Sequence, residues 1–235
     1  MASPLAGADG CKGGWILVQV AHPGAPVTHV LCPDAATLLA RTPRDAVLGI
    51  DIPIGISDRD RRAAEVECKR ALGSRRSSVF WSPVRAALDA TTHEDANARN
   101  RDASGLGLSA QAFHITWRIA EVDALLRADV RAAARVHEVH PEACFAALNG
   151  GVPMRHPKKR AEGQAERRAL LAPVFPGAFE RIREAYLARE VASDDILDAL
   201  AALWTASRIA AGTARHFPAG QTPRDRYGLP MVIHA

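Results

Sequence analysis

The chain of 235 residues is long enough for one large domain, and 48% of its residues are hydrophobic, which suffices for an ordinary buried core. Its net charge of +4 permits an anionic partner without demonstrating one. The four cysteines form no CxxC pair, which argues against a zinc site or a disulfide framework. The start "MASPLAGADG" lacks a signal-peptide pattern and no apolar run is long enough to cross a membrane, so we expect a soluble cytoplasmic protein.

The first part of the chain alternates short apolar runs with turns. We predict strands over residues 5–11, 15–20, 27–32 and 46–55, with a helix over 34–41 between the last two. The glycine pair at 13 and 14 makes the first two strands a hairpin. The fourth strand has few polar positions, which is typical of a central strand covered on both faces.

The pattern changes after residue 57, where arginines and polar residues predominate as far as about residue 108. We interpret 57–108 as a helical and loop insertion after the fourth strand. A helix is then predicted over 109–128, with Phe113, Trp117, Ala120 and Ala124 on one stripe, and a fifth strand over 134–140. Further helices are predicted over 142–150, 161–172, 176–190 and 193–212, and an edge strand over 228–235. This order predicts one α/β domain over 1–235, built on a mixed five-stranded sheet flanked by helices.

The last long helix begins with three aspartates in "SDDILDALAALW". Ser193 is a natural N-cap, and the helix dipole favours Asp194 and Asp195 in the first turn. Asp198 lies one turn further on, where like charges repel, so capping does not explain it. Bulky side chains occupy the opposite face, and small residues follow Asp198, as though another element approaches closely there. A purely structural acidic helix start remains an alternative.

Two further acids lie in predicted strands. Asp51 stands in the apolar stretch "GIDIPIG", where a charge is costly unless it is paired or bound to a cation, and Asp9 lies in the first strand. A hairpin residue for Asp9 and a strand-end cap for Asp51 are the structural alternatives. If the first and fourth strands are neighbours, both acids converge at one edge of the sheet, where the last helix brings Asp195 and Asp198.

Four carboxylates around one point repel one another unless cations neutralise them. Oxygen ligands suit Mg²⁺ or Mn²⁺, and two such ions about 3.5–4 Å apart activate water and stabilise a leaving oxygen in phosphodiester cleavage. We therefore expect one or two Mg²⁺ or Mn²⁺ ions at this site.

The order of elements and acids resembles the ribonuclease-H-like superfamily, and "DILDALA" is similar to the last-helix motif of RuvC-like resolvases. More closely, "GADGCKGGW", "GIDIPIG", "LGSRRSSVFWSP", "GLSAQAF", "EVHPEACFAALNG" and "DDILDALAA" resemble domain-of-unknown-function family 429, whose members are predicted to be nucleases of that fold. The resemblance covers nearly the whole chain. It implies a ribonuclease-H-like fold and assigns metal binding to Asp9, Asp51, Asp195 and Asp198.

Two glutamates in "HEVHPE" are further catalytic candidates. Glu142 follows a proline at a helix start, so a surface residue favoured by the helix dipole is the alternative. Glu138 lies in the fifth strand, where a satisfied structural acid is the alternative.

The stretch "RALGSRRSSVFWSP" has the composition of a phosphate-binding loop with an aromatic platform for a base. Its candidate substrate contacts are Arg75, Arg76, Ser77, Ser78 and Trp81, to which we add Lys12 of "DGCKGG". A basic loop with simply packed aromatics is the alternative. In "HPKKR", Lys158, Lys159 and Arg160 are interpreted as a solvated turn rather than a phosphate site.

Together these features predict a metal-dependent phosphodiesterase acting on DNA or RNA, with no membrane partner. One alternative is a nucleic-acid-binding protein of the same fold without catalysis. A protein that binds ATP or a sugar phosphate is ranked last, because actin-like and sugar-kinase proteins generally join two such domains. The oligomeric state stays open, with a homodimer as one option.

Overall fold

The structure, a computed structural model, describes residues 3–235. The chain divides into two units, which are described separately. The first contains the described residues up to Asp51, Ala134–Arg215 and His234–Ala235, and the second contains Ile52–Ala133 and His216–Ile233. The segment 57–108, expected to be an insertion, lies entirely in the second unit.

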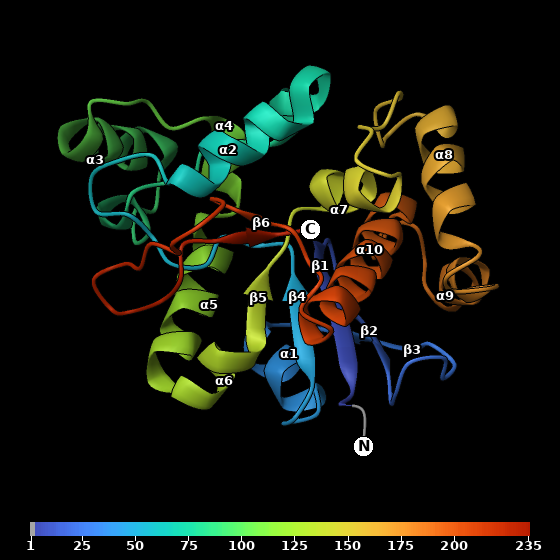
Figure 1. Ribbon diagram of the computed structural model, residues 1–235. Coiled ribbons are helices and arrows are strands. Elements are labelled where there is room, and N and C mark those ends of the chain that lie inside the picture. The colour runs from blue at the N-terminus through green and yellow to red at the C-terminus, as the bar shows by residue number, and fades with distance from the viewer. Residues whose placement is uncertain (1–2) are drawn as a thin grey trace. The chain divides into compact units, whose positions relative to one another are not determined.

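The first unit is built on a mixed five-stranded sheet (Figure 1). Its strands are β1 (Leu5–Cys11), β2 (Gly14–Val20), β3 (Thr28–Cys32), β4 (Val47–Ile50) and β5 (Val136–Glu138), in the order β3-β2-β1-β4-β5. β1 is antiparallel to β2 and parallel to β4, and β4 is parallel to β5. The predicted α/β fold is therefore confirmed. The first and fourth strands, whose contact the sequence left open, are neighbours. β4 is shorter than predicted and ends immediately before Asp51.

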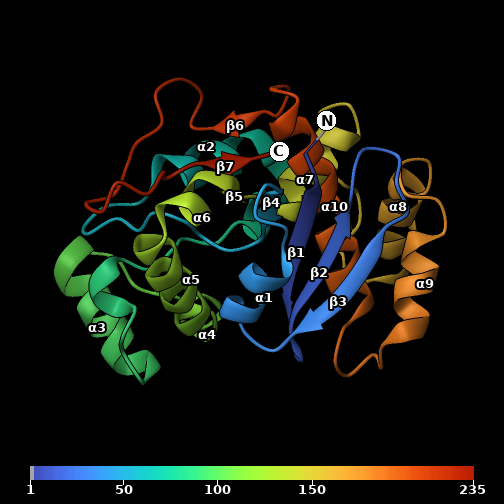
Figure 2. The same ribbon diagram turned by 90° about the horizontal axis from the view of Figure 1, so that it is seen from below.

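Helices pack around this sheet (Figure 2). They are α1 (Ala35–Arg41), α7 (Pro141–Leu148), α8 (Ala161–Leu171), α9 (Ala178–Ala185) and α10 (Ser193–Ala210). α1 begins as predicted, because the carboxylate of Asp34 accepts a hydrogen bond of 2.7 Å from the backbone N–H of Thr37. α10 contacts β1, β2 and β4 and is backed by α7, α8 and α9. Every residue of α10 from Ile196 to Leu203 is buried, so the face that carries the aspartates is also part of the interior.

Two glycines bring α10 unusually close to the sheet. Gly7 of β1 and Gly49 of β4 are paired in register, and both lie under the helix. A Cβ atom on Gly7 would lie 2.2 Å from the backbone nitrogen of Leu203, and one on Gly49 would lie 2.7 Å from the carbonyl oxygen of Ala202. Because side chains alternate along a strand, Asp9 points to the same face of the sheet as Gly7. The helix and the acid of β1 therefore share one face.

The second unit is mainly helical. Its elements are α2 (Ala63–Leu72), η1 (Gly73–Ser78), η2 (Arg85–Ala87), α3 (His93–Ser104), α4 (Ala110–His114) and α5 (Thr116–Ala128), followed by α6 (Val130–Arg135), which runs into the first unit. The helix predicted over 109–128 is interrupted at Ile115, and the predicted apolar stripe is wrong, because Trp117 is 53% exposed. The predicted edge strand at 228–235 is reduced to β7 (Ile233–His234), which pairs with β6 (His216–Phe217).

No helix among residues 3–235 is both long enough and apolar enough to cross a membrane.

Candidate functional site

Asp9 and Asp51 lie beside each other where β4 ends and its parallel pairing with β1 stops. Ala8 of β1 is in register with Ile50 of β4, and the backbone N–H of Asp51 donates a hydrogen bond of 3.1 Å to the carbonyl oxygen of Ala8. Asp9 is only 6% exposed, and its Oδ1 accepts a hydrogen bond of 2.9 Å from the N–H of Gly10. The sequence indicated that these two acids converge if the first and fourth strands are neighbours, and the sheet meets that condition.

Asp198 is the buried acid of α10. Its exposure is 0%, and its Oδ2 forms an ion pair with Nζ of Lys158. Its Oδ1 is also buried but accepts no hydrogen bond from any residue that the structure describes. A buried carboxylate oxygen without a partner is costly, so this atom marks a place where a ligand would be stabilising.

The charges of these acids act on one another. Burial, followed by the charges of Asp51 and Asp198, raises the pKa of Asp9 well above its usual range. Burial is also the largest influence on Asp51, whose pKa is raised to about 7 although the nearby Lys158 ammonium opposes the shift. The pKa of Asp198 is raised by burial against the same opposing charge. The buried Asp9 and Asp198 and the half-buried Asp51 therefore share one electrostatically crowded region.

Asp195 is the outermost member of the group and also caps its helix. Its Oδ2 accepts a hydrogen bond of 2.8 Å from the backbone N–H of Ala192, which is the N-cap residue. The expectation that Ser193 is the N-cap is therefore wrong, since Ser193 is the first helical residue. Burial raises the pKa of Asp195 to about 6, while the bond from Ala192 acts in the opposite direction.

The two glutamates have different surroundings from the aspartates. Glu142 is buried at the start of α7 and forms an ion pair of 2.6 Å with Arg167 of α8, so the surface alternative is wrong. Glu138 is buried in β5 and in register with Ile50, which places its side chain on the alternate face from Gly49. Its charge still contributes to the raised pKa of Asp51. Glu142 thus has a structural partner, and Glu138 lies beside the aspartates rather than among them.

Lys158 is a charged neighbour of the acids that the sequence did not indicate. It lies in a turn as predicted, but its side chain reaches the acids instead of solvent. Burial acts to lower the pKa of Lys158, but the charges of Asp198, Asp9 and Asp51 outweigh it and raise that pKa. Several carboxylates close together need a positive counter-charge, which indicates that a basic residue lies nearby. This requirement does not identify which lysine or arginine of the sequence supplies the charge.

The side chains present fit a divalent cation in their chemistry. Asp9, Asp51 and Asp198 offer oxygen donors with excess negative charge, and Oδ1 of Asp198 is without a hydrogen bond among the described residues. Within residues 3–235, however, no three Asp, Glu, His or Cys side chains already stand in an arrangement that would hold a metal. Side-chain rotation at the aspartates would be required for them to bind an ion together.

The predicted substrate loop lies in the second unit. Trp81 is half-buried, with the guanidinium of Arg61 4.1 Å and Nζ of Lys69 4.7 Å from its ring centroid. Trp81 and Ser77 line a cavity of about 250 Å³ together with these two basic residues.

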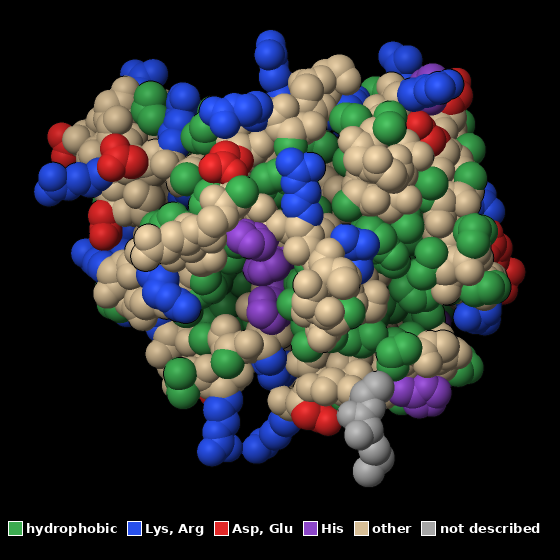
Figure 3. All heavy atoms as spheres, in the orientation of Figure 1, with side chains coloured by type: hydrophobic (Ala, Val, Ile, Leu, Met, Phe, Trp, Pro, Cys, Tyr) green, Lys and Arg blue, Asp and Glu red, His purple; other side chains and the backbone are tan. Residues whose placement is uncertain are grey.

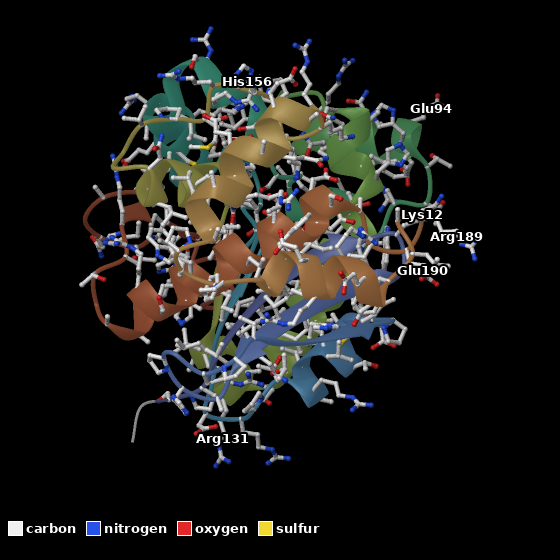
Figure 4. The ribbon with its side chains drawn as sticks, turned by 90° about the vertical axis from the view of Figure 1, so that its right-hand side faces the viewer. Lys12, Glu94, Arg131, His156, Arg189 and Glu190 are labelled. Carbon is white, nitrogen blue, oxygen red and sulfur yellow. The ribbon has the colours of Figure 1, made fainter. Side chains whose placement is uncertain are left out.

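The other predicted contacts lie in two places. Arg76 is exposed on η1, and the hydroxyl of Ser78 donates a hydrogen bond of 2.7 Å to the carbonyl oxygen of Arg75, so Ser78 helps to close the turn. Lys12 is exposed in the β1–β2 turn of the first unit, and Figure 4 shows it near Glu190. The two segments are joined by a hydrogen bond of 2.9 Å from the N–H of Gly13 to the carbonyl oxygen of Glu190. On the face drawn in Figure 3, lysine and arginine side chains are scattered and form no single stripe.

Comparison with known families bears on this arrangement. A family model described as "Protein of unknown function (DUF429)" matches residues 7–222. The chain belongs to the DUF429 family. No curated protein and no solved structure matches it. The DUF429 match includes Asp9, Asp51, Lys158, Asp195 and Asp198, and the sheet order of this DUF429 member is consistent with a ribonuclease-H-like fold.

Proposed function

We propose that this DUF429 protein is a metal-dependent phosphodiesterase that acts on nucleic acid. The observation that carries the proposal is the convergence of three carboxylates: the buried Asp9 of β1, the half-buried Asp51 just after β4 and the buried Asp198 of α10. A protein gains no stability from burying carboxylates that repel one another, so such a group is favoured where it serves a ligand or a reaction. Oxygen ligands on a rigid sheet and a buried helix would also be well positioned for catalysis.

Asp9, Asp51 and Asp198 would hold the Mg²⁺ or Mn²⁺, with Asp195 at the margin. A bound ion of this kind supplies an activated water and stabilises the leaving oxygen of a phosphodiester. The chain's own contribution is to fix the acids: β-sheet hydrogen bonds hold the backbone of Asp9 and Asp51, and the Gly7–Gly49 contact seats α10. Because the pKa values of Asp9 and Asp51 are raised, cation binding would release protons.

Nucleic acid is the substrate class that best suits the remaining features. The second unit places Trp81, Arg61 and Lys69 around one cavity, a combination of aromatic and cationic groups that suits a base and a phosphate. The net charge of +4 acts in the same direction.

A second candidate is a nucleic-acid-binding protein without catalysis. The ion pair between Lys158 and Asp198 favours it, because an internal ammonium already neutralises one of the acids. This alternative predicts salt-sensitive binding that needs no metal and survives Asp9→Asn. Binding of ATP or a sugar phosphate has weaker support, since Lys12 is exposed in its turn and residues 3–235 contain one such five-stranded sheet.

The test is a cleavage assay with single-stranded, duplex, hybrid and branched DNA and RNA in the presence of Mn²⁺. We expect cleavage of at least one substrate and its loss in Asp9→Asn. Asp45→Asn is the matched control, because Asp45 is exposed in the turn before β4. If no substrate is cleaved and calorimetry detects no Mn²⁺ binding, the proposed function is wrong.

A further inference from the structure

The turn that carries Lys158 is held firmly by the helix that follows it. The carboxylate of Glu166 accepts hydrogen bonds from the backbone N–H groups of Arg155 and His156, at distances of 2.9 to 3.2 Å. A Cβ atom on Gly163 would lie 2.1 Å from the carbonyl oxygen of Pro157, so α8 begins in direct contact with the turn. Figure 4 labels His156 on this segment. The position of the Lys158 backbone is therefore set by α8.

A buried arginine ties the same turn to α7. Arg167 donates hydrogen bonds to the carbonyl oxygens of His156 and Gly163, at 3.1 and 2.8 Å, and pairs with Glu142. The Arg167 and Glu142 side chains are only 1% and 5% exposed, so they are shielded from solvent. Truncating either partner would leave a buried charge unpaired, so the ion pair should hold the turn and α7 together in the folded protein. The hydrogen bonds from α8 and the ion pair with α7 therefore hold the turn in a position from which Lys158 reaches the acids.

Several carboxylate oxygens are already engaged. Oδ2 of Asp198 is paired with Lys158, Oδ1 of Asp9 accepts from Gly10, and Oδ2 of Asp195 accepts from Ala192. A pair of ions normally needs carboxylates that offer both oxygens, one to each ion. Each of these three acids has one oxygen engaged, which favours one ion over two, and the ammonium of Lys158 supplies positive charge beside it.

We propose that Lys158 takes the place of a second divalent cation, so that the site binds one ion and Lys158 contacts a non-bridging oxygen of the substrate phosphate. The Lys158 side chain is 35% exposed while that of Asp198 is 1% exposed, so the lysine lies between the buried acid and solvent, where a phosphate would arrive. An ammonium placed there would stabilise negative charge on the phosphate. This inference rests on the proposed function.

The first test measures Mn²⁺ alone, by calorimetry and electron paramagnetic resonance on the full chain. We expect one Mn²⁺ per wild-type chain, with the spectrum of an isolated ion. Lys158→Met should bind a second Mn²⁺ or bind the first at least 10-fold more tightly, because the competing ammonium is gone. Lys158→Arg should keep one ion, and Lys159→Met, at an exposed neighbour, is the matched control.

The outcomes separate the two proposals. Two spin-coupled Mn²⁺ ions in the wild type would overturn the role of Lys158 and leave the proposed function intact, a result that requires no variant to fold. Unchanged stoichiometry and affinity in a folded Lys158→Met would also overturn it. No Mn²⁺ binding by either protein would contradict the proposed metal site itself. In the cleavage assay, at Mn²⁺ concentrations that fill one site only, Lys158→Met should lower kcat by roughly 10²–10³-fold, as loss of one donor to the reacting group does, while Lys158→Arg retains part of the activity.

Discussion

Gly7 of β1 and Gly49 of β4 lie side by side in register, and the backbone of α10 passes directly over both. Asp9 follows Gly7 by two positions within β1, so the face of the sheet that receives the helix also presents Asp9. Asp51 follows directly after β4, where its N–H is hydrogen-bonded to the carbonyl oxygen of Ala8. The helix in turn carries Asp198 into the interior. The glycine pair therefore allows the helix that carries Asp198 to approach the sheet closely.

Gly7→Ala tests this relationship. The new methyl group would overlap backbone atoms of Leu203 and Ala199, which cannot rotate away, so α10 has to move. We expect a loss of roughly 1–3 kcal/mol or more in the free energy of unfolding, measured with urea, together with weaker Mn²⁺ binding. Gly107→Ala is the control, since Gly107 is exposed and a methyl group there would meet no atom closer than 3.4 Å. A Gly7→Ala protein as stable as the wild type would contradict the close packing.

Replacing Asp51 should stabilise the metal-free protein against unfolding and abolish the proposed binding of Mn²⁺. The pKa of Asp51 is raised from 3.8 to about 7, so the folded state binds more protons than the unfolded state within this window. Stability is therefore present at low pH and is lost as pH rises toward 7. Asp51→Asn removes that loss of stability. We expect the free energy of unfolding without metal to rise by on the order of 1–2 kcal/mol at neutral pH, measured by thermal or urea unfolding.

Asp198→Asn provides the contrast. This variant removes the ion-pair partner of Lys158 and leaves the ammonium beside the remaining acids. The increase in the free energy of unfolding should therefore be smaller than for Asp51→Asn, or absent. Equal stabilisation by both substitutions would show that the Lys158–Asp198 pair contributes nothing.

The support of the Lys158 turn can be tested through Arg167. Arg167→Met leaves Glu142 buried without its partner, and we expect a loss of about 3–5 kcal/mol in urea unfolding. The double variant Arg167→Met with Glu142→Leu should recover much of this loss, because two apolar side chains can replace a buried ion pair. A single variant with nearly wild-type stability would mean that the pair is not a structural support.

His137 predicts a pH dependence of opposite sign. Burial, and then the charge of His234 packed edge-to-face at 5.2 Å, lowers the pKa of His137 from 6.5 to about 4. Between these values the unfolded state binds more protons, so this residue's contribution to stability rises from pH 4 to 6.5. The contribution should disappear in His137→Gln, seen as a smaller difference in stability between about pH 4.5 and 6.5 than in the wild type. Identical pH profiles would contradict the assignment.

Most of the sheet could be predicted because its strands are short apolar runs separated by turn residues, and the neighbouring placement of Asp9 and Asp51 followed from strand order. The burial of α10 on both its bulky and its small-residue faces could not be predicted in the same way. A helical wheel separates bulky from small residues, but only the two strand glycines explain why the small face is buried as well.

Lys158 shows a different limit of sequence analysis. A lysine in "HPKKR" has the composition of a solvated turn, and its contact with Asp198 depends on how Glu166 and Arg167 hold that turn. The interrupted helix at Ile115 is a third case, since the 3.6-residue periodicity of the sequence continues across the break between α4 and α5.

The most direct test of the account is a crystal structure of the protein soaked in Mn²⁺, with anomalous scattering to locate the ion. We predict an anomalous peak within ligand distance, about 2.0–2.3 Å, of carboxylate oxygens from Asp9, Asp51 and Asp198. Lys158 should remain beside this peak. If no peak appears at these acids even at a high Mn²⁺ concentration, the claim that they form a metal centre is contradicted.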